Sequence, residues 1–109
     1  MTREFIITST FDKRWEKLNL DDDDLQELQN YIMKNFIPGD TIQRTGGAIK
    51  LRWALAHKGK SGGIRIIYAD IPHLSHTHML LCYDKNEQDD LTDEQKKQVK
   101  KLIQTLKGE

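Results

Sequence analysis

The sequence has few of the features that mark secreted, membrane-bound or disulfide-stabilised proteins. Cys82 is its only cysteine, so the chain cannot form an internal disulfide. We therefore expect a cytoplasmic protein in which Cys82 is a small buried side chain. No run approaches the roughly 18 apolar residues that a membrane-spanning helix requires. The N-terminus carries Glu4 and only a short apolar run, so it does not predict a signal peptide.

Net charge is also lacking, since 17 basic residues balance 17 acidic ones. The charges are unevenly distributed, however. Residues 41–68 carry six bases and no acid, whereas residues 1–40 carry nine acids and five bases and residues 69–109 eight acids and six bases. The six cations are Arg44, Lys50, Arg52, Lys58, Lys60 and Arg65. This concentration fits a polyanionic partner, although the charge pattern alone is equally compatible with a solvated hairpin that binds nothing.

Motifs for metal binding and nucleotide hydrolysis are missing as well. His73, His76 and His78 lie close together, but only Asp70 stands near them as a further ligand, so we expect no metal and no cofactor. The segment KGKSGG at 58–63 does not have the spacing of a phosphate-binding loop, and it joins two predicted strands instead of opening a helix.

The chain length is typical of one domain, and we predict a single α+β domain over residues 1–109. Phe5–Ile7 is a β-prone run, and Phe11 and Trp15 then mark the apolar face of a short helix. The four aspartates at 21–24 precede a second helical pattern. We interpret them as the start of that helix and not as a calcium site.

The period-2 pattern of the next two predicted strands places cations on one face. In residues 48–55, Lys50 and Arg52 alternate with apolar residues, and residues 64–71 form the following strand. A tight antiparallel hairpin sets Arg65 across from Lys50 or Arg52. Like charges this close repel one another, so we expect an anion to be placed between them.

The last strand and helix complete the predicted order β-α-α-β-β-β-α. Residues 78–83 are strongly apolar and are expected to form the central strand of the sheet. Thr92 and Gln95 form a capping box that begins the last helix. Its predicted buried stripe consists of Val99, Leu102, Ile103 and Leu106. Four lysines lie mostly off this stripe, and either are simply solvated or face RNA: Lys96, Lys97, Lys100 and Lys101.

A series of short motifs runs through residues 39–106. The motifs are Gly39-Asp40, Ile42-Gln43, Thr45-Gly46-Gly47, Lys50, Arg52, Lys58-Gly59-Lys60, Gly62-Gly63, Arg65-Ile66-Ile67-Tyr68, Tyr83, Lys85-Asn86-Glu87 and Asp90-Leu91-Thr92. None is specific alone, but in this order and spacing they resemble the HigB branch of the RelE-like toxins.

The resemblance implies a small antiparallel sheet flanked by helices, and the activity of a type II toxin. Such toxins enter the ribosomal A site, cut the messenger RNA there and arrest translation. The endoribonuclease reaction needs no metal, because the 2′-hydroxyl of the RNA attacks the adjacent phosphate. Basic side chains stabilise the charge that develops on the phosphoryl oxygens.

By position, the resemblance also assigns roles to side chains. Arg65 is expected to hold the transition-state phosphate, while Lys50 and Arg52 contact phosphate or act as general acid. Three residues near the end of the last strand match further catalytic groups: Tyr83, Lys85 and Asn86. Docking on ribosomal or messenger RNA is expected of Arg44, His57, Lys58, Lys60, Lys96, Lys97 and Lys100.

The general base stays open. Better-known relatives have an arginine after the lysine and a tyrosine a few residues later, where this chain has Asn86 and Thr92. The candidates are Tyr83, Lys85 and His57, the last because a histidine can accept a proton near neutral pH.

The resemblance implies partners too. A HigA-like antitoxin with a helix-turn-helix domain is expected to restrain the toxin, and the toxin would reach operator DNA only through that antitoxin. The ribosome with bound messenger RNA is the target, and no membrane is involved. The alternative is a non-nuclease toxin like the gyrase-inhibiting ParE relatives, or a module that binds only its antitoxin.

Overall fold

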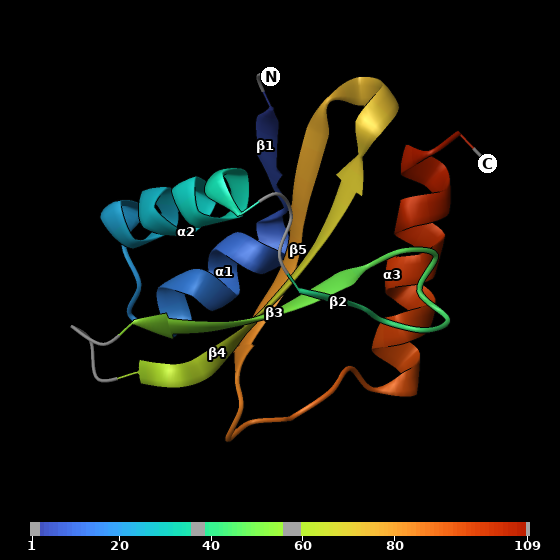
Figure 1. Cartoon of the computed structure of the whole chain (residues 1–109). Coiled ribbons are helices and arrows are strands. Elements are labelled where there is room, and N and C mark those ends of the chain that lie inside the picture. Colours follow the sequence, from blue (N-terminus) through green and yellow to red (C-terminus); the bar gives the residue numbers. More distant parts are fainter. Residues whose placement is uncertain (1–2, 36–38, 56–59, 109) are drawn as a thin grey trace.

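The computed structural model describes residues 3–35, 39–55 and 60–108. In chain order the elements are β1 (Glu4–Ile7), α1 (Ser9–Lys17), α2 (Asp22–Lys34), β2 (Asp40–Thr41), β3 (Ile49–Leu55), β4 (Lys60–Ile71), the 3-10 helix η2 (Pro72–Leu74), β5 (His76–Asp84) and α3 (Asp93–Leu106). They form three layers, with α1 and α2 on one face of a sheet and α3 on the other (Figure 1). None of the helices described is long and apolar enough to cross a membrane.

The five strands follow the spatial order β1-β5-β4-β3-β2. The pairs from β2 to β5 are antiparallel, whereas β1 pairs with β5 in parallel, with Glu4 opposite His76. The predicted α+β class and order of elements are confirmed, with the two-residue β2 as an addition. The predicted central place of residues 78–83 is wrong, because β1 covers one edge of β5 and the central strand is β4.

Each face of the sheet carries its own hydrophobic core, so β4 is buried on both sides. Ile64, Ile66 and Tyr68 pack beneath α1 and α2, whereas Ile67, Ala69 and Ile71 pack beneath α3. The core beneath α1 and α2 also contains three aromatic rings, each stacked on the next: Phe11, Trp15 and Trp53. The alternation along β4 is the one that its sequence predicts.

Capping boxes begin α2 and α3; the sequence predicts the box at α3 and, for α2, a helix start at the aspartates. The backbone N–H of Asp24 donates to the Asp21 carboxylate at 2.9 Å, and the N–H of Asp21 donates to the Asp24 carboxylate at 3.0 Å. Thr92 and Gln95 form the corresponding pair at α3. The aspartates at 21–24 are therefore a helix start, where acidic side chains also complement the helix dipole.

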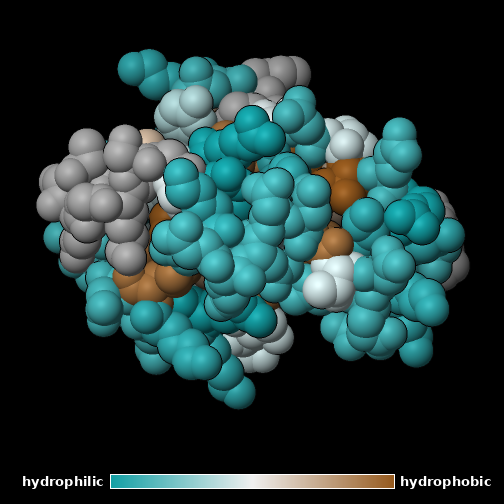
Figure 2. Space-filling model, turned by 90° about the horizontal axis from the view of Figure 1, so that it is seen from below, coloured by the Kyte–Doolittle hydropathy of each residue, from teal (hydrophilic) through white to brown (hydrophobic). Residues whose placement is uncertain are grey.

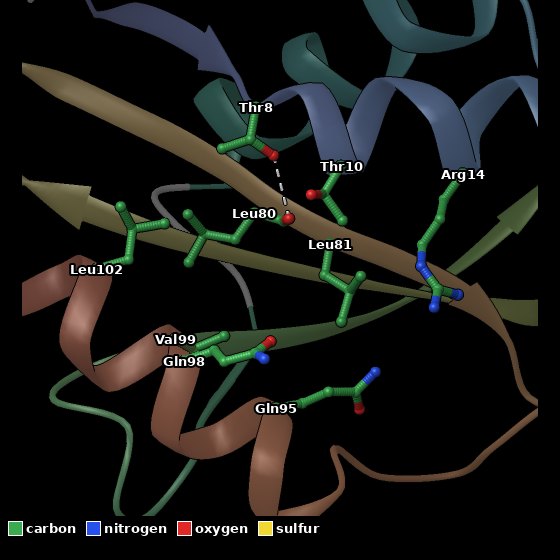
Figure 3. Close-up of a pocket in the computed structure, with 9 residues that line it drawn as sticks. All are labelled: Thr8, Thr10, Arg14, Leu80, Leu81, Gln95, Gln98, Val99 and Leu102. Carbon is green, nitrogen blue, oxygen red and sulfur yellow. Dashed lines mark hydrogen bonds between the residues drawn. The ribbon is translucent and has the colours of Figure 1, made fainter.

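A groove lies between α1, β5 and α3 (Figure 3). Leu80, Leu81 and Val99 line it, and Leu102 stands at its α3 side. The prediction that Leu102 is buried is wrong, since its exposed fraction is 38%. Val99 and Ile103 occupy the side of α3 that packs on the sheet, which leaves Leu102 at the groove.

Leu80 is an extra residue in β5, at the register shift between Ile67 and Tyr68 of β4. The hydroxyl of Thr8 donates to the carbonyl oxygen of Leu80 at 3.1 Å, drawn as a dashed line in Figure 3. The same hydroxyl accepts from the backbone N–H of Phe11 at 3.1 Å and so caps α1. One threonine therefore joins the start of α1 to the bulge in β5.

Thr8→Ala is expected to lower the free energy of unfolding by about 1–2 kcal/mol, because it removes both hydrogen bonds. Thr8→Ser keeps the hydroxyl and is expected to unfold like the wild type. The exposed Thr10, two residues along the chain, provides the control Thr10→Ala. Urea denaturation measures the difference in unfolding free energy, provided that its dependence on urea concentration (the m value) is the same for all variants. Equal losses for Thr8→Ala and Thr10→Ala would contradict the prediction.

Candidate active site

Three cations of β3 and β4 lie on one face of the sheet. Arg52 is directly opposite Arg65, as the predicted hairpin requires, and Lys50 is opposite Ile67. Ile67 packs beneath α3, so the alternation along both strands places all three cations on the α3 face. We call Lys50, Arg52 and Arg65 the cation cluster.

Arg65 is the most buried member of the cation cluster, with an exposed fraction of 7%. Lys50 is half-buried and Arg52 is exposed. Arg65 has Arg52 of β3 as its neighbour along one edge of β4 and Tyr83 of β5 as its neighbour along the other edge. A cation held between two neighbouring strands needs little reorganisation to bind an anion, and its field is screened less than that of a fully exposed cation.

Two aspartates from the segment between β5 and α3 contact the cation cluster. Lys50 Nζ lies 2.5 Å from Asp90 Oδ1, and the Arg65 guanidinium lies 3.7 Å from the Asp89 carboxylate. The hydrogen bond and charge of Lys50 hold the pKa of Asp90 below its usual value. These carboxylates partly neutralise Lys50 and Arg65.

Sequence reasoning did not assign a role to Asp89, and it used Asp90 only as part of a motif. A signal for both existed. Antiparallel pairing of β4 with β5 sets Arg65 opposite Tyr83, so the residues that follow Tyr83 must pass close to the cation cluster.

Tyr83 keeps its proton near neutral pH. Burial, followed by the charge of Asp90, raises the pKa of Tyr83 to about 12. Its hydroxyl donates to the backbone carbonyl of Asp89 at 3.3 Å. A phenol with this pKa can donate a hydrogen bond or a proton, but it is a poor general base at pH 7. This argues against Tyr83 as the general base.

The other residues predicted around the hairpin are less well placed by the structure. Lys85 and Asn86 are exposed in the turn that follows β5. His57 and Lys58 lie outside the described residues. Lys60 begins β4, but its side chain also lies outside the described part of the chain.

A second group of cations lies on α3 and on the loop between β2 and β3. Arg44, Lys96, Lys97 and Lys100 line one shallow hollow together with Asp93. Arg44 adopts the left-handed conformation, with φ 65°, and its guanidinium lies 3.8 Å from the Asp93 carboxylate. The structure thus brings together four of the residues predicted to bind RNA. We call the three lysines the lysine face.

The described histidines, His73, His76 and His78, are arranged for neither metal binding nor catalysis with the cation cluster. In the described ranges, no three or more His, Cys, Asp or Glu side chains are grouped to hold a metal ion. His76 Nε2 lies 3.2 Å from the Glu4 carboxylate. Burial and the neighbouring His76 lower the pKa of His78. Both histidines lie at the end of β5 opposite to Tyr83.

The end of the molecule that carries the turn after β5 is strongly polar. Figure 2, which views this end from below, shows mainly hydrophilic residues, with hydrophobic ones only in small patches. Such a surface fits a charged ligand better than an apolar one. The cation cluster and the protonated Tyr83 can bind a phosphate and stabilise additional negative charge on its oxygens.

Comparison with known families identifies the chain's relatives. A family model described as the RelE toxin of the RelE / RelB toxin-antitoxin system matches residues 4–108. The match runs from β1 through α3, and it includes the cation cluster, Tyr83 and the lysine face.

Proposed function

We propose that this chain, which belongs to the RelE toxin family, is a ribosome-dependent endoribonuclease of the HigB branch that cuts messenger RNA in the A site. The observation that carries the proposal is the direct pairing of Arg65 with Arg52, beside Lys50, on one face of the sheet. Like-charged side chains directly opposite each other destabilise a sheet, so their presence argues for an anionic ligand. A phosphodiester has the charge and geometry that arginine binds best.

In the proposed reaction, the 2′-oxygen of the RNA bonds to the adjacent phosphorus and the bond from phosphorus to the 5′-oxygen breaks. Arg65 and Lys50 neutralise the charge that grows on the phosphoryl oxygens. A base takes the proton of the 2′-hydroxyl, with Lys85 and His57 as candidates. Tyr83, which holds its proton to a pKa of about 12, is suited to donate a hydrogen bond or a proton to the departing 5′-oxygen.

Toxins of this family act with a partner antitoxin and on the ribosome. We further propose that the antitoxin is HigA-like, that its helix-turn-helix domain binds the operator, and that the toxin meets DNA only in that complex. The whole cycle would then take place in the cytoplasm, where ribosome, messenger and antitoxin are found.

Primer extension on a defined messenger tests the proposed function. Cuts are expected only when ribosomes are present, at positions that correspond to the A site. A DNA gyrase supercoiling assay runs in parallel on the same preparation. If gyrase were inhibited and the messenger left intact, the chain would act as a ParE-like toxin, and the nuclease proposal would fail.

Replacing Lys96, Lys97 and Lys100 with alanine is expected to weaken ribosome binding and to flatten its salt dependence. Each lysine that contacts a phosphate contributes about one unit of slope in a plot of log affinity against log salt. The matched control replaces three lysines on α1 and α2: Lys13, Lys17 and Lys34. Sedimentation with ribosomes over a range of salt measures both slopes. Identical slopes for the two triple variants would show that the lysine face does not contact the ribosome.

A further inference from the structure

The two aspartates that contact the cation cluster lie on its solvent side. The side chain of Asp90 is 67% exposed, but that of its partner Lys50 only 15%. The Asp89 side chain is 73% exposed, but that of Arg65 only 8%. A ligand that arrives from solvent therefore meets the carboxylates before it reaches Lys50 and Arg65.

The backbone of this segment is held in place, so only the aspartate side chains need to move. The Tyr83 hydroxyl donates to the carbonyl of Asp89 at 3.3 Å, and Gln88 Nε2 donates to the carbonyl of Asp90 at 2.9 Å. Leu91, the next residue, is buried in the core beneath α3. A rotation about the side-chain bonds of each aspartate is enough to uncover the cations.

We propose that Asp89 and Asp90 form an anionic latch, which occupies the cation cluster in the free protein and is displaced by a phosphate of the substrate. The identity of that phosphate as RNA rests on the proposed function. The carboxylate partners of both ion pairs are mostly exposed and can be hydrated when they leave, so the latch opens to a phosphate held nearby at high local concentration. Free RNA at low concentration competes poorly. The latch thus favours substrate that the ribosome already presents.

The latch also explains why Asp89 and Asp90 lie at a site that is proposed to bind RNA, where acidic residues are not expected. Carboxylates beside a phosphate site repel the ligand if they stay in place. The two carboxylates weaken RNA binding only slightly if their side chains rotate away. In the protein without RNA, they offset the repulsion between Arg52 and Arg65.

Binding to a short RNA that cannot be cleaved, with 2′-O-methyl groups throughout, tests the latch without ribosomes. Asp89→Asn and Asp90→Asn are each expected to tighten binding about threefold, and the double variant about tenfold. The control is the double variant Asp22→Asn with Asp23→Asn, two exposed aspartates at the start of α2 that cause the same change in net charge. Fluorescence anisotropy gives the dissociation constants. If binding by the Asp89/Asp90 double variant were no tighter than that of the control, the latch would be disproved.

A kinetic readout separates a latch from a positioning role. If the carboxylates only block the site, their removal lowers KM and leaves kcat unchanged on ribosomes. If Asp90 instead orients Lys50 for the reaction, Asp90→Asn lowers kcat, and this outcome overturns the latch.

Titration with inorganic phosphate, followed by NMR, distinguishes the latch from the nuclease proposal. Tighter phosphate binding by the double variant, together with no cleavage on ribosomes by any form, would support the latch and refute the nuclease. Normal cleavage together with unchanged phosphate binding would support the nuclease and refute the latch.

Discussion

Arg65→Ala is expected to lower the rate of messenger cleavage on ribosomes by about 10²–10³-fold, the usual cost of losing one well-placed donor to a transition-state oxyanion. Arg65 is the most buried cation of the cluster and its backbone is fixed between β3 and β5, so we expect its guanidinium to need little reorganisation to bind a phosphate. Single-turnover primer extension measures the rate, and ribosome sedimentation shows whether binding survives.

Two further variants make the Arg65 result interpretable. Arg65→Gln fills most of the arginine volume, so a loss shared with Arg65→Ala at an unchanged melting temperature reports on chemistry and not on folding. Arg14→Ala removes a surface arginine that lies 2.8 Å from the Glu87 carboxylate, and it is expected to cleave normally. Full activity of both Arg65 variants would exclude Arg65 from the reaction.

Phe11→Ala is expected to lower the free energy of unfolding by about 3–5 kcal/mol, the typical cost of deleting a buried aromatic ring. Phe11 is fully buried, and its ring stacks on Trp15 at a centroid distance of 5.4 Å. Trp15 in turn stacks on Trp53 of β3 at 5.9 Å. The expected loss is a large part of the roughly 5–15 kcal/mol that holds a domain of this size together.

Thermal unfolding followed by circular dichroism measures this loss, with an expected fall in melting temperature of more than about 10 °C. Tyr31→Ala provides the control, because Tyr31 is an aromatic residue on α2 with an exposed fraction of 42%. Phe11→Leu should recover much of the stability. A Phe11→Ala protein as stable as Tyr31→Ala would mean that the stack contributes little to the fold.

Local patterns were sufficient to predict most of the elements. The alternation in β3 and β4 and the capping boxes of α2 and α3 depend on residues a few positions apart, so they can be recognised in the sequence. A tight hairpin leaves few registers, so the sequence predicts Arg65 across from Lys50 or Arg52, and the structure pairs it with Arg52. The positions of the cation cluster could therefore be predicted, whereas the catalytic roles of its members stay a prediction.

The remaining features depend on contacts between distant segments. Nothing near Glu4 in the sequence indicates that β1 pairs with β5 in parallel, and the two residues of β2 are too few to show a period. Leu102 continues the apolar stripe of α3, but α1 and β5 decide that it lines a groove. The contact of Asp89 and Asp90 with the cations likewise joins the segment after β5 to the hairpin of β3 and β4, which no local pattern predicts.

The extra residue in β5 decides which side chain faces the cation cluster. In an uninterrupted strand, Met79 and Tyr83 would point to the same face, because they are an even number of residues apart. The bulge at Leu80 breaks that parity, so Met79 and Cys82 enter the core beneath α1 and α2 while Tyr83 joins the α3 face. If Leu80 were instead taken into the ladder without a bulge, Cys82 and Tyr83 would exchange faces. The thiol of Cys82 would then face the cations, and the phenol of Tyr83 would enter the core beneath α1 and α2. The hydrogen bond from the Thr8 hydroxyl to the Leu80 carbonyl helps to hold the bulge that prevents this exchange.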